Sequence, residues 1–134
     1  MAAPEPVAAP VTSAAPDAVP ATLKARRDFL ACARARRWAM PGMVVQGRDR
    51  GEPGGPVRVG YTCSKKVGNA VTRNRAKRRL RAAVREVLPR TARPGWDYVL
   101  IGRSGATVSR PFVDLCADLE TAVSRIHRQK REGA

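Results

Sequence analysis

The sequence predicts an α/β fold, an α+β sandwich in which helices pack on one central sheet. Two kinds of pattern alternate along the chain. Long segments place apolar residues at helical spacing, and short segments are either continuously apolar or alternate with period two. Their order is helix, strands, strongly basic helix, strand, helix. A chain of 134 residues has room for one domain, which buries a little under about 70% of its unfolded surface and has a modest core.

Residues 1–21 differ in composition from the rest of the chain. They contain five Pro and many Ala, and they have no aromatic or basic residue. Such a segment cannot bury enough apolar surface to fold, so we expect a disordered tail. It also lacks the basic start and continuous apolar region of a secretory signal, which favours the cytoplasm. We place the domain at 22–128 and a flexible C-terminal end at 129–134.

The first predicted helix begins near Thr22, whose hydroxyl can cap it, and runs to about Trp38. Pro41 and Gly42 then end it. Phe29 is one of the few large apolar residues on this helix, and its simplest interpretation is a core residue.

Three short segments, at 43–46, 57–63 and 96–101, have the apolar patterns of strands. A short apolar run at 43–46 is the first, and a turn rich in Gly and Pro comes after it. At 57–63 apolar and polar residues alternate, which is typical of a strand with two different faces. Tyr61 in this strand either packs in the core or stacks on a base of single-stranded RNA. The run at 96–101 is almost entirely apolar and indicates an interior strand.

A long basic helix lies between the last two strands. Either Gly68–Asn69 or Asn74 can open it, and no Gly or Pro follows until Pro89, where we expect it to stop. At 100° per residue its apolar side chains fall on one arc, which predicts that this side docks on the core. The arc consists of Ala76, Leu80, Ala83, Val84, Val87 and Leu88.

The last predicted helix begins after Ser109 or Arg110 and carries apolar residues at helical spacing, which should pack on the sheet. These residues are Phe112, Leu115, Leu119, Ala122, Val123 and Ile126.

Positive charge is concentrated in the middle of the chain. The net charge is +15, and nine Lys or Arg lie between Lys65 and Arg85, whereas no Asp or Glu lies between Glu52 and Glu86. Like charges one turn apart cost about 0.2–0.5 kcal/mol per pair in an isolated helix. A merely solvated face usually mixes both signs, so this pattern favours binding to a polyanion. No apolar run is long enough for a membrane span.

Catalytic and metal-binding patterns are missing from the sequence. Cys32, Cys63 and Cys116 are widely spaced and fit reduced structural thiols, because no Cys-x-x-Cys motif is present. His127 is the only histidine, and no carboxylates cluster as they do in two-metal nucleases. We therefore expect no catalytic centre and no metal site in the polypeptide itself.

The stretch from Tyr61 to Arg81 resembles the signature of the bacterial ribonuclease P protein component. It reads Tyr-Thr-Cys-Ser-Lys-Lys-Val-Gly-Asn-Ala-Val at 61–71, Arg-Asn-Arg at 73–75 and Lys-Arg-Arg-Leu-Arg at 77–81. The resemblance extends from about Leu23 to Leu119. It implies the order αβββαβα, a sheet of about four strands and a left-handed βαβ crossover, as in the ribosomal-protein-S5-domain-2-like fold.

The resemblance also implies a function. In this family a large RNA subunit with bound Mg²⁺ removes the 5′ leader of precursor tRNA, and the protein assists in a one-to-one complex with that RNA. The leader lies in a cleft between the first helix and the sheet, which points to Phe29, Arg37, Gln46 and Tyr61. Relatives often carry a second aromatic at the position of Ala33. The RNA-subunit-binding residues that the resemblance implies are Lys65, Lys66, Asn69, Arg73, Asn74, Arg75, Lys77, Arg78, Arg79 and Arg81.

Two other classes fit the sequence less well. A ribosomal or assembly protein that binds RNA without assisting an enzyme could have the same fold, because fold does not determine function. A helix-turn-helix DNA regulator would need a second short helix within a few residues of the basic one, and the sequence has none there.

Overall fold

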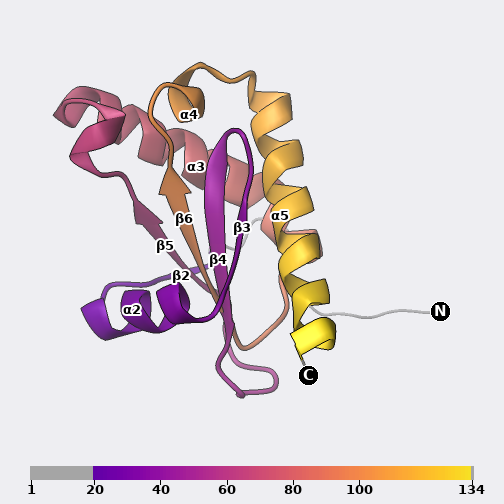
Figure 1. Ribbon diagram of the computed structural model, residues 1–134. Coiled ribbons are helices and arrows are strands. Elements are labelled where there is room, and N and C mark those ends of the chain that lie inside the picture. The colour runs from indigo at the N-terminus through magenta and orange to yellow at the C-terminus, as the bar shows by residue number, and fades with distance from the viewer. Residues whose placement is uncertain (1–19, 134) are drawn as a thin grey trace.

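A computed structural model describes residues 20–133 of the chain. Its five strands form one sheet in the order β2-β5-β6-β4-β3, in which β2, β5 and β6 are parallel to one another and β4 is antiparallel to β6 and β3 (Figure 1). The α/β prediction is confirmed, with five strands in place of about four. The elements are β2 (Ala21–Thr22), α2 (Arg26–Arg34), β3 (Arg36–Ala39), β4 (Met43–Asp49), β5 (Arg58–Thr62), η1 (Lys65–Val67), α3 (Ala70–Thr91), β6 (Trp96–Gly102), α4 (Ala106–Ser109) and α5 (Phe112–Gly133).

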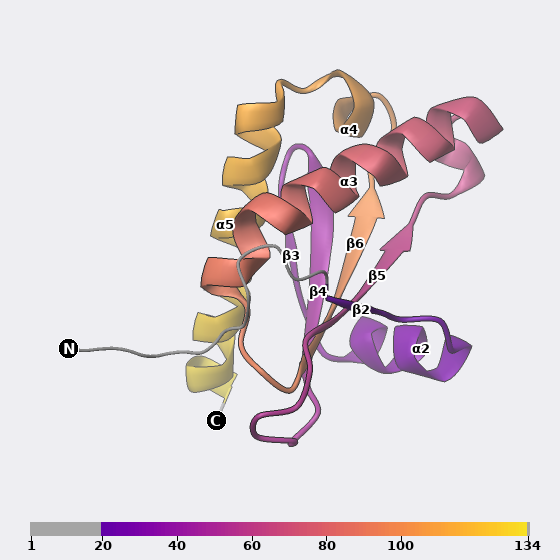
Figure 2. The same ribbon diagram turned by 180° about the vertical axis from the view of Figure 1, so that it is seen from behind.

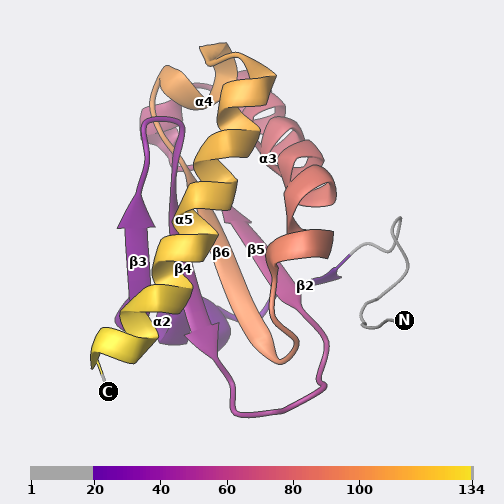
Figure 3. The same cartoon turned by 90° about the vertical axis from the view of Figure 1, so that its right-hand side faces the viewer.

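The helices cover the two faces of the sheet unequally. α3 and α5 pack on one face, which we call the closed face, and α2 lies across the lower part of the other, which we call the open face (Figures 1 and 3). With α3 in front and the strands pointing up, β6 lies to the left of β5 (Figure 2). The β5-α3-β6 crossover is therefore left-handed, against the usual right-handed preference.

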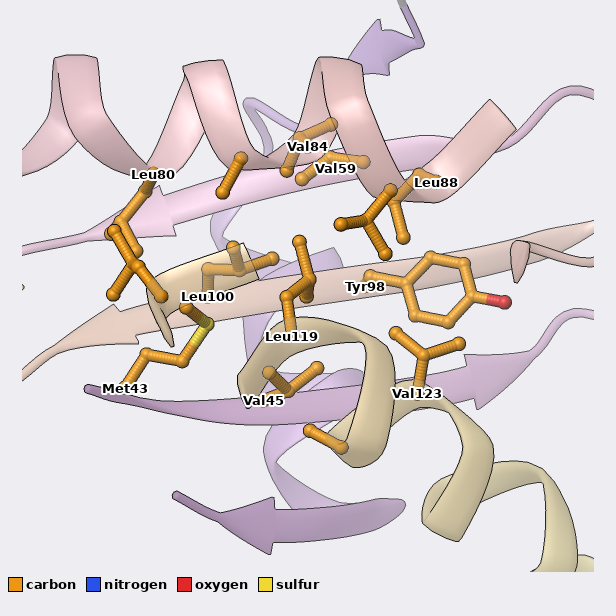
Figure 4. Close-up of a cluster of buried hydrophobic side chains, with 14 of the residues drawn as sticks. Met43, Val45, Val59, Leu80, Val84, Leu88, Tyr98, Leu100, Leu119 and Val123 are labelled. Carbon is orange, nitrogen blue, oxygen red and sulfur yellow. The ribbon is translucent and has the colours of Figure 1, made fainter. Parts of the chain in front are cut away.

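The core fills the closed face (Figure 4). All six residues of the apolar arc predicted on α3 are buried, which confirms that this side of the helix docks. Tyr98 reaches from β6 toward α5, where its hydroxyl lies 2.8 Å from His127 Nε2 and accepts a hydrogen bond from the Arg93 N–H. Burial raises the pKa of Tyr98. The lone histidine is therefore a core residue that ties α5 to the start of β6.

The ends of α3 differ from the prediction in one respect. Asn69 caps the helix, because its Oδ1 accepts a hydrogen bond of 2.9 Å from the Thr72 N–H. Pro89 does not stop it: α3 continues to Thr91, and the Ala92 N–H still bonds to the Leu88 carbonyl. Pro89 cannot donate a hydrogen bond to the carbonyl one turn earlier, and its ring crowds that carbonyl, but only two helical residues follow it, so the disturbance is confined to the end of the helix.

The predicted first helix is wrong at both ends. Thr22 belongs to β2, where the flanking N–H groups of Ala21 and Leu23 bond to β5, and α2 starts only at Arg26. Ala21, which we placed in the tail, is thus part of the sheet, whereas 1–19 lie outside the described residues. The segment 36–38 is not helical but forms β3. Its backbone pairs with β4, and a helix at this position would leave that edge of β4 without a partner strand.

The last helix is divided in two. A short α4 precedes Pro111, and α5 runs to Gly133, beyond the predicted boundary at 128. Five of the six predicted apolar residues are buried, but Phe112 is 39% exposed. Phe112 is the first residue of α5 and lies one turn before Leu115, the first side chain of this helix that reaches the core.

Candidate nucleic-acid interface

The cations from Lys65 to Arg85 have no carboxylate partner among the side chains that the structure describes. None of these nine side chains forms a salt bridge with a residue in 20–128, whereas Arg90, in the last turns of α3, pairs with Glu120 at 2.9 Å. We call the exposed part of this segment the basic surface. It consists of Lys65, Lys66, Asn69, Asn74, Arg75, Arg78, Arg81 and Arg85.

The loop before α3 is held by local hydrogen bonds. Ser64 Oγ accepts from the Lys66 N–H at 3.3 Å, which fixes the single turn of η1. Gly68 has φ 149°, and a Cβ there would lie 2.9 Å from Thr72 Cβ, so only glycine fits this bend. The side-chain oxygen of Asn69 is used as the cap. Lys65 and Lys66 are thereby placed beside the first turn of α3, where its free N–H groups also favour anions.

Three of the predicted RNA-subunit-binding residues are not fully exposed. Lys77, Arg73 and Arg79 are half-buried, and the Nε atoms of both arginines are buried without a hydrogen-bond partner among the described residues. Arg79 donates from Nη2 to the carbonyl of Arg110, so it links α3 to the segment before α5.

Tyr61 lies on the closed face. It packs against the main core, and the Arg81 guanidinium of α3 lies over its ring, 5.2 Å from the centroid. Burial raises the pKa of the Tyr61 hydroxyl to about 12, and the nearby Arg81 lowers it only in part. The structure therefore places Tyr61 as a half-buried residue at the margin of the main core.

Phe29 lies on the opposite face. It packs in a small second core, and a Cβ on Gly60 would lie 2.6 Å from its ring, so α2 approaches β5 closely only because residue 60 is glycine. Neighbouring residues on a strand point to opposite faces. Because Gly60 faces Phe29, Tyr61 faces away from it, and the expectation that both aromatics line one cleft is wrong.

Arg37 and Gln46 share the open face with Phe29. They are directly opposite each other in the β3–β4 pair, and Gln46 is in turn opposite Val99, which packs in the same small core as Phe29. Arg37 is exposed and Gln46 is 8% exposed. Above α2 this face of the sheet is not covered by another element (Figure 1). The structure therefore places three of the four predicted leader-binding residues on one face.

A buried carboxylate organises the lower edge of the open face. Asp97 is fully buried and accepts hydrogen bonds from Arg58 Nε at 2.8 Å and from Arg50 Nη1 at 2.7 Å, while Arg48 lies 3.6 Å away. Burial alone would raise the pKa of Asp97, but Arg58 and Arg50 bring it below its usual range. Sequence reasoning missed this cluster. Its signal is the single acidic residue within the apolar run at 96–101.

Residues 20–133 contain no group of three or more His, Cys, Asp or Glu that could hold a metal ion. Burial raises the pKa of the Cys32 thiol to about 11 and also raises those of Cys63 and Cys116, so all three are protonated at neutral pH. The buried Asp97 carboxylate accepts hydrogen bonds from Arg50 and Arg58. No helix of the described residues is long and apolar enough to cross a membrane.

Comparison with known proteins agrees with this geometry. Residues 19–127 match the sequence profile of the Ribonuclease P family. The chain is 61% identical over 110 residues to the ribonuclease P protein component of Ruegeria pomeroyi, covering 81% of this chain and 87% of that protein. It is 49% identical over 108 residues to that of Paramagnetospirillum magneticum, covering 78% and 80%.

Two solved structures have the same fold. The RNase P protein of Staphylococcus aureus superposes with a TM-score of 0.63 at 27% identity, covering 77% of this chain and 92% of that one. The RNase P protein from Thermotoga maritima gives a TM-score of 0.63 at 27% identity, covering 75% and 92%.

Proposed function

Because the chain belongs to the ribonuclease P protein component family, we propose that it binds the RNA subunit of ribonuclease P through the basic surface. As part of an endoribonuclease complex, it assists removal of the 5′ leader from precursor tRNA. The RNA subunit with its Mg²⁺ ions carries out the hydrolysis, in a one-to-one complex with the protein in the cytoplasm.

The observation that carries this proposal is the unneutralised charge between Lys65 and Arg85. Nine cations that find no carboxylate partner in the described part of the chain repel one another in the free protein, and RNA phosphates supply the missing counter-charge. Release of condensed counterions then contributes to binding and makes it dependent on salt. Arginine forks suit this task, because they donate two parallel hydrogen bonds to one phosphate.

The 5′ leader is assigned to the open face. Phe29 offers an aromatic edge beside the uncovered part of the sheet, Arg37 offers a charge, and Gln46 offers both donors and acceptors. Single-stranded RNA is commonly held by aromatic stacking combined with basic residues. Tyr61 is not part of this site, because it lies on the closed face under Arg81.

The polypeptide contributes binding energy and position. Neutralising phosphates lowers the repulsion between the RNA subunit and precursor tRNA, and holding the leader orients the scissile bond. We assign the side chains described here no part in the bond cleavage itself; they include no group of three or more His, Cys, Asp or Glu that could hold a metal ion.

Reconstitution tests the proposal. The purified chain is added to a bacterial ribonuclease P RNA at low Mg²⁺, and cleavage of precursor tRNA at the 5′ end of the mature sequence is measured. We expect the rate to rise. If the chain binds the RNA without raising cleavage, the proposal is wrong and a non-enzymatic RNA-binding role takes its place.

A charge-matched pair of variants tests the surface. Arg75→Gln with Arg78→Gln should weaken binding to the RNA subunit and reduce the slope of log affinity against log salt by about two units, one for each lost contact. Arg93→Gln with Arg128→Gln changes the net charge equally, but both side chains are exposed near the far ends of α3 and α5. Equal effects of the two pairs would show that only net charge matters.

A further inference from the structure

Phe112 is an exposed aromatic in a chain that has few aromatics. Within residues 20–133 the exposed large hydrophobic side chains are Leu30, Val71, Phe112 and Val113, and Phe112 is the only ring among them. Trp96 and Tyr98 are buried, and the remaining rings of these residues are half-buried. The folded core gives no reason for a 39% exposed phenylalanine at the start of α5.

The segment that carries this ring is rigidly held. The Arg110 guanidinium donates to Asp118 at 2.7 and 3.2 Å, and the Pro111 carbonyl accepts from the N–H groups of Asp114 and Leu115, both at 3.0 Å. Pro111 and Val113 on either side of the ring are exposed, and Val113 is 73% exposed. We call residues 110–113 the Phe112 platform. A ring fixed in this way loses little conformational freedom when it binds.

The platform borders the basic surface. Arg79 donates to the Arg110 carbonyl, two residues before Phe112, so α3 and the platform touch at this point. Arg75 is exposed one helical turn earlier on the same side of α3, a rise of about 6 Å. α4, which ends just before this platform, also packs against α3 (Figure 2).

We propose that the Phe112 platform is a stacking site for an unpaired base of the RNA that occupies the basic surface. The strand's phosphates meet Arg75 and its neighbours, and one base is splayed onto the Phe112 ring. An exposed aromatic next to unpaired cations matches single-stranded nucleic acid, in which bases alternate with phosphates. The inference rests on the proposed function and identifies its RNA as the RNA subunit, because α5 and the leader-binding open face lie on opposite sides of the sheet.

The test compares three variants in binding to a bacterial ribonuclease P RNA. Phe112→Ala should weaken binding by about 5- to 150-fold, the range for one lost base–aromatic stack. Its salt slope should stay unchanged, because a stack releases no counterions. Phe112→Trp should restore the affinity. Leu30→Ala, which also removes an exposed apolar side chain but from α2, should leave the affinity unchanged.

The outcomes separate this inference from the proposed function. If the parent chain does not bind the RNA subunit, the proposed function fails. If the parent binds and Phe112→Ala binds equally well, only the stacking site is refuted. If Phe112→Ala instead abolishes self-association of the free chain, measured by sedimentation, the platform is a contact between copies and the inference is wrong. Circular dichroism establishes that each variant is folded.

Discussion

The two faces of the sheet are built by different interactions. On the closed face the main core holds nineteen buried residues, whereas the cluster under α2 on the open face holds three, Leu23, Cys32 and Val99. The lower edge of the open face is held instead by Asp97 and its arginines. Apolar burial, at about 25 cal/mol per Å², therefore stabilises mainly one side of the sheet. The other side keeps polar side chains on an uncovered part of the sheet, where we propose that the leader binds.

The largest expected effect concerns Asp97. Asp97→Asn leaves Arg50, whose side chain is 5% exposed, without its buried anion, and should lower the free energy of unfolding by about 3–5 kcal/mol. Urea denaturation measures it. The folded-state pKa of Asp97 is lowered, so its contribution is present above the unfolded pKa and is lost as pH falls through the folded one. Asp97→Asn should therefore lose less unfolding free energy than the parent as the pH falls. A urea midpoint equal to that of the parent at neutral pH would show that the cluster does not stabilise the open face.

A core truncation on the closed face should have the next largest effect. Leu119 is fully buried between α5 and the sheet (Figure 4), so Leu119→Ala should lower the free energy of unfolding by about 2–5 kcal/mol. Leu30→Ala removes the same atoms from an exposed position on α2 and should cost less than about 0.5 kcal/mol. Similar losses for both leucines in chemical denaturation would contradict the unequal division of stability.

Leader binding tests the division of function between the faces. Phe29→Leu should lower the affinity of the reconstituted complex for precursor tRNA by about 1–3 kcal/mol relative to mature tRNA, because one stack is lost. Tyr61→Leu should not change the ratio of the affinity for precursor tRNA to that for mature tRNA, since Tyr61 lies on the closed face. The two binding constants are measured for each folded variant. A fall of the ratio in Tyr61→Leu but not in Phe29→Leu would reverse the assignment.

The smallest effect is expected at alkaline pH. The pKa of Cys32, on the buried side of α2, rises from 9.0 to about 11 on folding because burial disfavours the thiolate. Its stabilising contribution is present below pH 9 and is lost as pH rises through 11, so about 1 kcal/mol should disappear between pH 8 and pH 10. In urea titrations, the free energy of unfolding of Cys32→Ala should decrease less than that of the parent between pH 8 and pH 10. A decrease equal to that of the parent would mean that the thiol is already accessible in the folded state.

Local patterns in the sequence were enough to predict the elements with strong periodicity. The apolar arc on α3, the interior strand at 96–101 and five of six core positions on α5 follow from burial at regular spacing, and the structure confirms them. The density of cations around Arg75 also needs no structure to be recognised, because like charges without counter-ions indicate a polyanionic partner whatever the fold.

Tertiary pairing decided the rest. The segment 36–38 became a strand because β4 offered a partner for its backbone, and Asp97 acquired its role from arginines that are distant in sequence. The left-handed crossover and the separation of Phe29 from Tyr61 likewise depend on which side of the sheet each helix packs. A periodic pattern shows that a residue faces a neighbour. Only the packing of helices on the sheet shows which neighbour it faces, because that choice depends on contacts between segments far apart in the chain.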